Sequence, residues 1–307
     1  MSTVVHPGAA PPPLRRRPKV PSSNLELGWL ALPAALVLLA LFAVPMGAVL
    51  VSSFGTSVSG QIGTEGFTLS NYAEVMTSPL YQAVILRTLR ISLTVTLVSL
   101  VMAYPVALAM SFGPDWCRRV LLVAVICPIM ISAVVRSYGW ILVLGLDGPL
   151  NQLMMAVGVI DRPAKMVFNE LGVTIGLIHV YLPFMILPLS SVLSKLDVRL
   201  IEAARVMGAG SFTVFTRVIV PASLSGLAAG SVLVFTLSAG ALVTPGLLGG
   251  SSFNLLAPLI AKTMMIELNW AMGSTLAVVL VAISFVVIAL SNLATRERVS
   301  SAKEEKA

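Results

Sequence analysis

The chain has 307 residues, of which 57% are hydrophobic and 11% are charged, and its formal net charge is +7. Soluble domains carry charge on about a quarter of their residues, so this composition excludes an ordinary soluble domain and predicts an integral membrane protein. With two cysteines, two histidines and no zinc-ligand spacing, P-loop or nucleophile-elbow motif, the sequence argues against a disulfide framework, a metal site and an enzyme.

The first 27 residues combine many prolines with the basic residues Arg15, Arg16, Arg17 and Lys19. Proline fixes φ and lacks an amide donor, so helix and sheet are both disfavoured there. The sequence therefore predicts a disordered cytoplasmic tail over residues 1–27.

Six apolar stretches follow, and each is long enough to cross a membrane as a helix, which takes about 20 residues. The first is also longer than the apolar core of a signal peptide, which is about 7–15 residues. The stretches cover residues 28–52, 86–112, 119–145, 172–194, 223–248 and 271–294. We therefore expect an all-α integral membrane protein in which six transmembrane helices form one domain, residues 28–294, with a C-terminal tail at 295–307.

The distribution of lysine and arginine predicts how the helices are oriented. With the N-terminus inside, 14 of the 20 basic residues fall in the two tails, the loop after the second stretch and the segment 195–222. Because basic residues concentrate in cytoplasmic loops, both termini and the segment 195–222 are expected on the cytoplasmic side of the inner membrane. The net positive charge is thus interpreted as topology and not as a nucleic-acid-binding surface.

The segment 195–222 has the features of two short helices joined by a turn. Asp197 is a suitable N-cap for a helix that starts near Val198, and Gly208 and Gly210 can adopt positive φ and end that helix. Pro221 marks the start of the next membrane helix. Residues at helical spacing predict one apolar face, made of Leu200, Ala203, Ala204 and Met207.

This segment, EAARVMGAGSFTVFTRVIVP, resembles the cytoplasmic loop of binding-protein-dependent ABC importer permeases, whose pattern is EAA, three residues, Gly, nine residues and I-x-L-P. The matching residues, at the same spacing, are Glu202, Ala203, Ala204, Gly208 and Pro221. Val218 and Val220 stand where the pattern usually has Ile and Leu. The alternative is a plain connecting loop that contains an amphipathic helix.

The resemblance implies a type I ABC importer fold and a set of partners. The five matching residues would couple the permease to a cytoplasmic ABC ATPase dimer, which binds the ATP, so that no cofactor is expected in this chain. The other implied partners are a second permease subunit, a periplasmic or lipid-anchored substrate-binding protein and membrane lipid; nucleic acid is not among them.

Further stretches resemble the spermidine/putrescine permease branch of that family. They include VVRSYGWILVLGLDGPLN at 134–151, HVYLPFMILPL at 179–189 and LSAGALVTPGLLGG at 237–250. The resemblance implies polyamine cargo, with iron, phosphonate, sulfate or opine as alternatives. A secondary transporter is the alternative from another class, but such proteins often carry intramembrane carboxylates, and the six stretches contain no Asp or Glu.

Several polar and aromatic residues are candidates for lining a transport pathway: Arg136, Tyr138, Trp140, Thr244, Glu267 and Trp270. The aromatic rings either stack on a cation or form an interfacial belt. Thr244, followed by Pro245, interrupts the fifth stretch, which fits either a gate or a simple helix end.

Arg136 lies within the third apolar stretch, where a charge is costly and normally faces the bundle interior. It either lines the pathway, braces loop carbonyls or pairs with Asp147 or Glu267. His179 is expected to be a hydrogen-bonded residue of the bundle and not a ligand.

Overall fold

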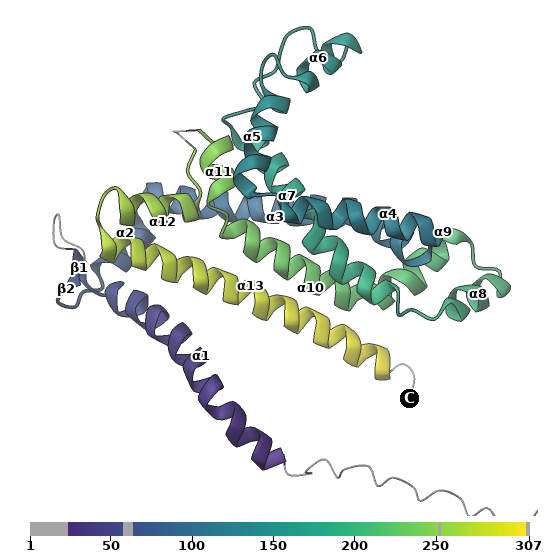
Figure 1. The fold of residues 1–307 in the computed structure, drawn as a ribbon, viewed down its shortest axis with the longest axis horizontal. Helices are drawn as coiled ribbons and strands as arrows, with labels where there is room; N and C mark the ends of the chain where they lie inside the picture. The colour runs from purple at the N-terminus through teal and green to yellow at the C-terminus, as the bar shows by residue number, and fades with distance from the viewer. Residues whose placement is uncertain (1–23, 58–63, 251–252, 305–307) are drawn as a thin grey trace, which may run out of the picture. The chain divides into compact units, whose positions relative to one another are not determined.

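The computed structural model describes residues 24–57, 64–250 and 253–304 (Figure 1). The chain divides into two compact units, Met1–Ala48 and Val49–Ala307. Helix α1, Asn24–Ser52, supplies the described part of the first unit. The predicted N-terminal tail lies outside the described residues up to residue 23, whereas residues 24–27 are helical, so the tail prediction was too long at that end.

The second unit is helical apart from one short hairpin, in which Thr56 pairs with Glu65. Its elements are β1 (Thr56–Ser57), β2 (Thr64–Glu65), α2 (Ser70–Thr77), α3 (Pro79–Phe112), α4 (Asp115–Ile126), the 3-10 turn η1 (Cys127–Met130), α5 (Ala133–Leu144), α6 (Pro149–Ala156), α7 (Glu170–Leu193), α8 (Val198–Val206), α9 (Ser211–Val214), the π turn η2 (Phe215–Ile219), α10 (Val220–Ala239), α11 (Val243–Leu248), α12 (Leu256–Met265) and α13 (Trp270–Glu304). The all-α prediction is confirmed.

Four helices of the described chain are long and apolar enough to cross a membrane: α3, α7, the continuous helix Ser211–Ala239 and α13 over Trp270–Ser291. A fifth span results if the bent pair of helices around η1 counts as one. The first predicted span, 28–52, lies in α1, whose described apolar part is the shorter helix Leu36–Ser52. By length and composition, the structure therefore gives four or five spans where six were predicted.

The predicted third span, 119–145, is not a straight helix. The helical segments before and after its middle differ in direction by 103°. Pro128 lies in η1 at the break, where its missing N–H interrupts the backbone ladder. Ser132 then caps α5, because its hydroxyl accepts a hydrogen bond from the Val134 amide at 3.3 Å.

The predicted fifth span, 223–248, is shifted toward the N-terminus. The helix begins at Ser211 and ends at Ala239, and the short helix α11 follows as a separate element. The outer segment 249–270, expected as a loop, contains helix α12. Helix α13 continues through Glu304, past the predicted end at residue 294.

The core of the bundle is built from α3, α7 and α10, which pack against one another (Figure 1). Ile91 of α3, Leu177 and Met185 of α7, and Val234 of α10 belong to one buried cluster. A buried hydrogen bond of 2.7 Å between the Tyr104 and Ser223 hydroxyls also links α3 to α10. Helix α7 thus packs against both α3 and α10. Helix α10 in turn connects the segment 195–222 with α11.

Two glycines of α10 allow it to approach α7 closely. A Cβ atom at Gly226 would lie 3.0 Å from the Pro188 carbonyl oxygen, and one at Gly230 would lie 2.7 Å from the Met185 sulfur. The glycines are four residues apart, so they lie on the same helix face. This small-residue pattern, common where membrane helices meet, was not recognised in the sequence.

Candidate functional site

The segment 195–222 folds around two of the predicted local signals. The Asp197 carboxylate accepts a hydrogen bond from the Arg199 amide at 3.0 Å and caps α8. Gly208 ends the helix with φ +84°, and the Ala209 amide bonds to the Ala204 carbonyl at 3.0 Å across this turn. Gly210, which was also expected to allow positive φ, has φ −67°. Only Gly208 therefore requires the freedom of glycine.

The predicted apolar face of α8 is divided between the interior of the segment and its surface. Ile201 and Ala204 pack against Val214 in a small hydrophobic cluster. Leu200, Ala203 and Met207, which were expected on the apolar face, are exposed. The physical reason is a tertiary contact, because α9 folds back onto α8 and selects the face that carries Ile201.

As a result, the segment carries several exposed apolar side chains. Val206, Met207 and Phe212 are 88%, 82% and 79% exposed, and Ala203 and Glu202 are exposed as well. We call these five residues the coupling surface. Clustered exposed apolar side chains with a charge beside them are typical of a protein-binding site.

Pro221 is the second residue of α10, as predicted for the start of the next membrane helix, but α10 continues from α9 and η2 without a break, over Ser211–Ala239. A proline ring collides with the carbonyl four residues earlier in a regular α-helix. Here the preceding turn is the π turn η2, in which the Val220 amide donates to the Phe215 carbonyl, five residues back. The helix accommodates the proline in this way, so that α9, η2 and α10 run directly from the coupling surface into the bundle.

The Phe215 ring in η2 contacts the Tyr104 ring of α3 edge to face, with 5.2 Å between ring centroids. Tyr104 is itself hydrogen-bonded to Ser223 of α10. Phe215 is therefore linked to α3 directly and, through Tyr104, to α10.

Some of the predicted pathway residues meet where α5, α7 and α11 pack together. The Ser137 hydroxyl donates to the Thr244 hydroxyl at 3.2 Å, and Thr244 is 4% exposed. The Trp140 ring lies edge to face with the His179 ring, with 5.6 Å between centroids. Thr244 thus belongs to a buried junction that joins the interrupted end of α10 to α5.

Arg136 and His179 do not make the expected contacts. Within the described residues, the Arg136 Nε and Nη1 atoms and the His179 Nδ1 atom are buried without hydrogen-bond partners. The alternative in which Arg136 pairs with Glu267 is not realised, because Glu267 pairs with Lys262 at 3.3 Å. The guanidinium consequently retains donors that an acceptor from outside the described chain would satisfy.

The remaining candidates lie elsewhere. Tyr138 is 55% exposed on α5. Glu267 and Trp270 lie at the turn between α12 and α13, and the buried Trp270 Nε1 has no partner among the described residues. Helices α12 and α13 contribute to a separate hydrophobic cluster, so the six candidates do not form one site.

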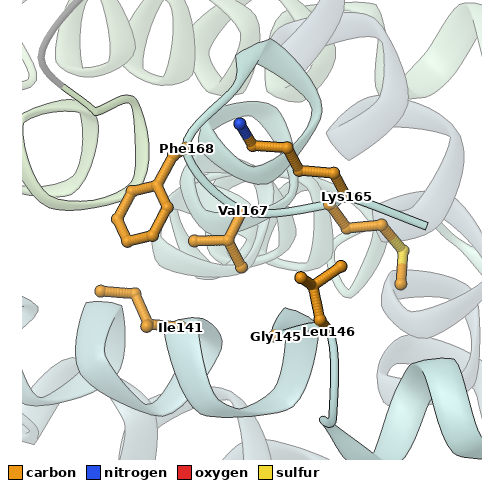
Figure 2. A pocket seen from close by; sticks show the side chains of 7 residues that line it. Ile141, Gly145, Leu146, Lys165, Val167 and Phe168 are labelled. Atoms are coloured by element: carbon orange, nitrogen blue, oxygen red, sulfur yellow. The ribbon is translucent and has the colours of Figure 1, made fainter. Parts of the chain in front are cut away.

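A cavity of about 370 Å³ at the C-terminal end of α5 was not anticipated (Figure 2). Its lining residues are Ile141, Gly145, Leu146, Lys165, Met166, Val167 and Phe168. Phe168 has φ +59°, a strained conformation for a side chain of this size. The neighbouring Gly250 also has positive φ, and a Cβ atom there would lie 3.0 Å from the Phe168 Cβ.

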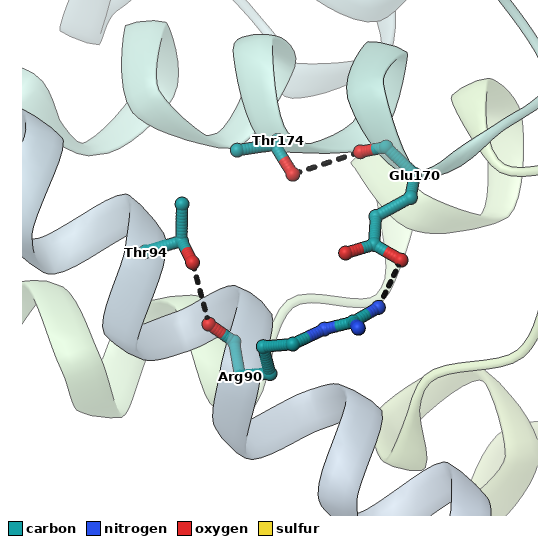
Figure 3. A network of polar contacts seen from close by, with 4 residues as sticks. All are labelled: Arg90, Thr94, Glu170 and Thr174. Atoms are coloured by element: carbon teal, nitrogen blue, oxygen red, sulfur yellow. Dashed lines mark hydrogen bonds and ion pairs between the residues drawn. The ribbon is translucent and has the colours of Figure 1, made fainter.

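A polar contact joins α3 to α7, where Arg90 forms an ion pair with Glu170 (Figure 3). The Asn169 side chain caps α7 by accepting from the Gly172 amide at 3.0 Å, so Glu170 occupies the first turn of a membrane-spanning helix. The predicted span began at residue 172, so Glu170 lies two residues before that apolar stretch, at the first residue of the helix. A pair separated by 80 residues has no local sequence signal.

Comparison with known sequences gives close relatives. Residues 96–298 match the family described as binding-protein-dependent transport system inner membrane component. The chain is 36% identical over 235 residues to the spermidine/putrescine transport system permease protein PotB of Haemophilus influenzae, covering 76% of this chain and 82% of that protein. With PotB of Escherichia coli K12 it shares 34% identity over 255 residues, covering 83% and 89% of the two chains.

Among solved structures, the fold is similar to a chain in the crystal structure of a bacterial alginate ABC transporter in complex with an alginate pentasaccharide-bound periplasmic protein. The TM-score is 0.71 at 17% sequence identity, with 89% of this chain and 94% of that chain covered. At this identity the likeness concerns the fold alone.

Proposed function

The chain belongs to the family of binding-protein-dependent transport system inner membrane components, and from this premise we propose that it moves a polyamine, spermidine or putrescine, across the inner membrane as a permease subunit of an ABC importer. The observation that carries the cargo assignment is the identity of 34–36% to two PotB proteins over most of both chains. The chain supplies the path and the mechanical connection, and no bond is made or broken in it.

The proposed mechanism starts at the coupling surface. Glu202 and Ala203, with the exposed Val206, Met207 and Phe212, seat in a groove of a cytoplasmic ATPase dimer, which binds the ATP. Ala204 is buried within the segment and holds α8 on α9, whereas Glu202 and Ala203 are free to contact the partner. Closure of the ATPases then moves α8, and the helix that runs through Pro221 carries this movement into the bundle.

In the proposed path, the junction of α5, α7 and α11 acts as part of the gate. The backbone between α10 and α11 is interrupted beside Thr244, and irregular backbone persists in a membrane only where it is buried in protein or lines a cavity. Arg136, Tyr138 and Trp140 lie on the adjoining helix α5, and Glu267 and Trp270 lie near the α12–α13 turn. A second permease subunit completes the path, and a periplasmic or lipid-anchored binding protein delivers the cargo.

We expect both termini and the coupling surface on the cytoplasmic side, because 14 of the 20 basic residues fall on that side in this orientation. A phosphatase that is active only outside the cytoplasm should be inactive when fused after Ala307 and active when inserted at Gly60. Enzyme activity in colonies, normalised to fusion protein level, measures this. The reverse pattern of activities would refute the orientation.

The cargo assignment is tested in cells. Uptake of labelled spermidine and putrescine is compared between a strain with the complete transport system and the same strain without this chain, at equal expression of the remaining subunits. Polyamine uptake should depend on the chain. Equal uptake in the two strains would exclude polyamines as cargo and leave the family assignment in place.

A further inference from the structure

Glu170 is the only carboxylate within the four single-helix spans of the described chain. It lies in the first turn of α7, where the positive end of the helix dipole favours a negative charge. Glu170 is the first residue of α7 and its side chain is partly exposed, so the carboxylate is accessible at the end of the span.

Glu170 lines an open groove of about 470 Å³ together with Leu171, Thr174 and Ile175. Leu171 and Ile175 are apolar, and they lie one and five residues along the helix from the carboxylate. The groove thus combines one negative charge with an apolar wall, which complements an alkyl chain that ends in an ammonium group.

The carboxylate is only partly satisfied by its partner. Within the described residues, the contact that joins the two side chains runs from Arg90 Nη2 to Glu170 Oε2 (Figure 3). The side chains of Arg90 and Glu170 are 61% and 41% exposed. Exposed ion pairs held by one contact are weak and exchange readily with other cations.

We propose that Glu170 binds an ammonium group of the polyamine, that the methylene chain lies along Leu171 and Ile175, and that Arg90 occupies the carboxylate when cargo is absent. The inference rests on the proposed function. Exchange of one cation for another keeps the Glu170 carboxylate paired during loading and release, while the exposed Arg90 guanidinium faces solvent when cargo is bound. Arg90 thereby returns to the carboxylate as the cargo moves on.

The competing explanation is that the ion pair merely braces α3 against α7. The two explanations predict different effects when Arg90 and Glu170 are neutralised one at a time. A brace is lost equally when either partner is neutralised, whereas an ammonium site needs Glu170 and not Arg90.

The test compares Glu170→Gln, Arg90→Gln and Glu170→Asp in the complete importer, reconstituted in proteoliposomes with its binding protein and saturating labelled spermidine. Glu170→Gln should lower the uptake rate by about fivefold, the effect of losing one partly exposed ion pair. Arg90→Gln should stay within about twofold of the wild type, because only the competing cation is lost. Glu170→Asp, which keeps the charge, should restore part of the rate.

Glu74→Gln is the matched control, since Glu74 is an exposed carboxylate of α2 that does not line the groove; its uptake should equal that of the wild type. Complex yield and thermal midpoint are recorded for each variant to separate misfolding from lost binding. Equal losses in Glu170→Gln and Arg90→Gln, or wild-type uptake in Glu170→Gln, would overturn the site. Absence of spermidine uptake by the wild-type importer would instead overturn the proposed function.

Discussion

Replacement of Gly208 by valine should reduce transport at least about tenfold while the protein still reaches the membrane, because a β-branched residue at positive φ costs roughly 1–2 kcal/mol or more. Gly208 has φ +84°, and no atom lies within 4 Å of a Cβ built there, so the penalty comes from the backbone alone. The strain would be relieved by opening the turn between α8 and α9, which displaces the coupling surface. Uptake is measured together with the amount of protein in isolated membranes.

The segment offers its own control for this experiment. Gly210 has an extended backbone with φ −67°, and a Cβ atom there also meets nothing within 4 Å, so Gly210→Val should be tolerated. Gly208→Asn should be intermediate, since asparagine adopts the left-handed region more easily than valine. Equal uptake in Gly208→Val and wild type would show that the turn does not set the position of the coupling surface.

Glu202→Ala should lower uptake without changing the fold of the segment, because the Glu202 side chain is exposed and the buried contacts of α8 come from Ile201 and Ala204. The loss then reflects a missing contact with the ATPase and not a rearranged turn.

Leucine at Gly226 is expected to destabilise the bundle. A Cβ atom at this position would lie 3.0 Å from the Pro188 carbonyl oxygen and 3.0 Å from a methyl group of Val192. Neither the carbonyl nor the branched side chain can move far, so α10 would be forced away from α7. Overpacking of this kind typically costs about 1–3 kcal/mol, and the thermal midpoint of the purified complex should fall accordingly.

Gly139→Leu serves as the comparison, because Gly139 lies in α5 with open space around its Cβ position. Its thermal midpoint should remain near that of the wild type. If Gly226→Leu left both the midpoint and the yield of the complex unchanged, the close contact between α7 and α10 would not be needed for stability.

Local signals in the sequence account for the parts of the fold that were predicted correctly. The hydropathy of the sequence located most of the membrane helices, because each contains an apolar run of about 20 residues, the length needed to cross the hydrocarbon core of a bilayer. The N-cap at Asp197 and the helix end at Gly208 were also identified, since both depend on the residue's own backbone and side chain.

The errors arise where distant contacts decide the structure. The buried face of α8 is selected by Val214, which the helical spacing of Leu200, Ala203 and Met207 could not indicate. The bend at Pro128 depends on Ser132 starting a new helix, while many membrane helices pass through a proline without breaking.

Two contacts within the bundle differ in whether the sequence contains a signal that predicts them. Gly226 and Gly230 have the four-residue spacing of close helix contacts, so the sequence did contain this signal. The sequence contains no such signal for the ion pair between Arg90 and Glu170, because the pair depends on the relative position of α3 and α7.

The most direct test of the account is uptake of labelled spermidine by proteoliposomes that contain this chain with its partner permease and ATPase, in the presence of the binding protein. The account predicts uptake that requires ATP and loaded binding protein, persists when ion gradients are collapsed, and is lost with Glu202→Ala. Spermidine uptake driven by an ion gradient without ATP, or ATP-driven uptake that excludes polyamines, would contradict it.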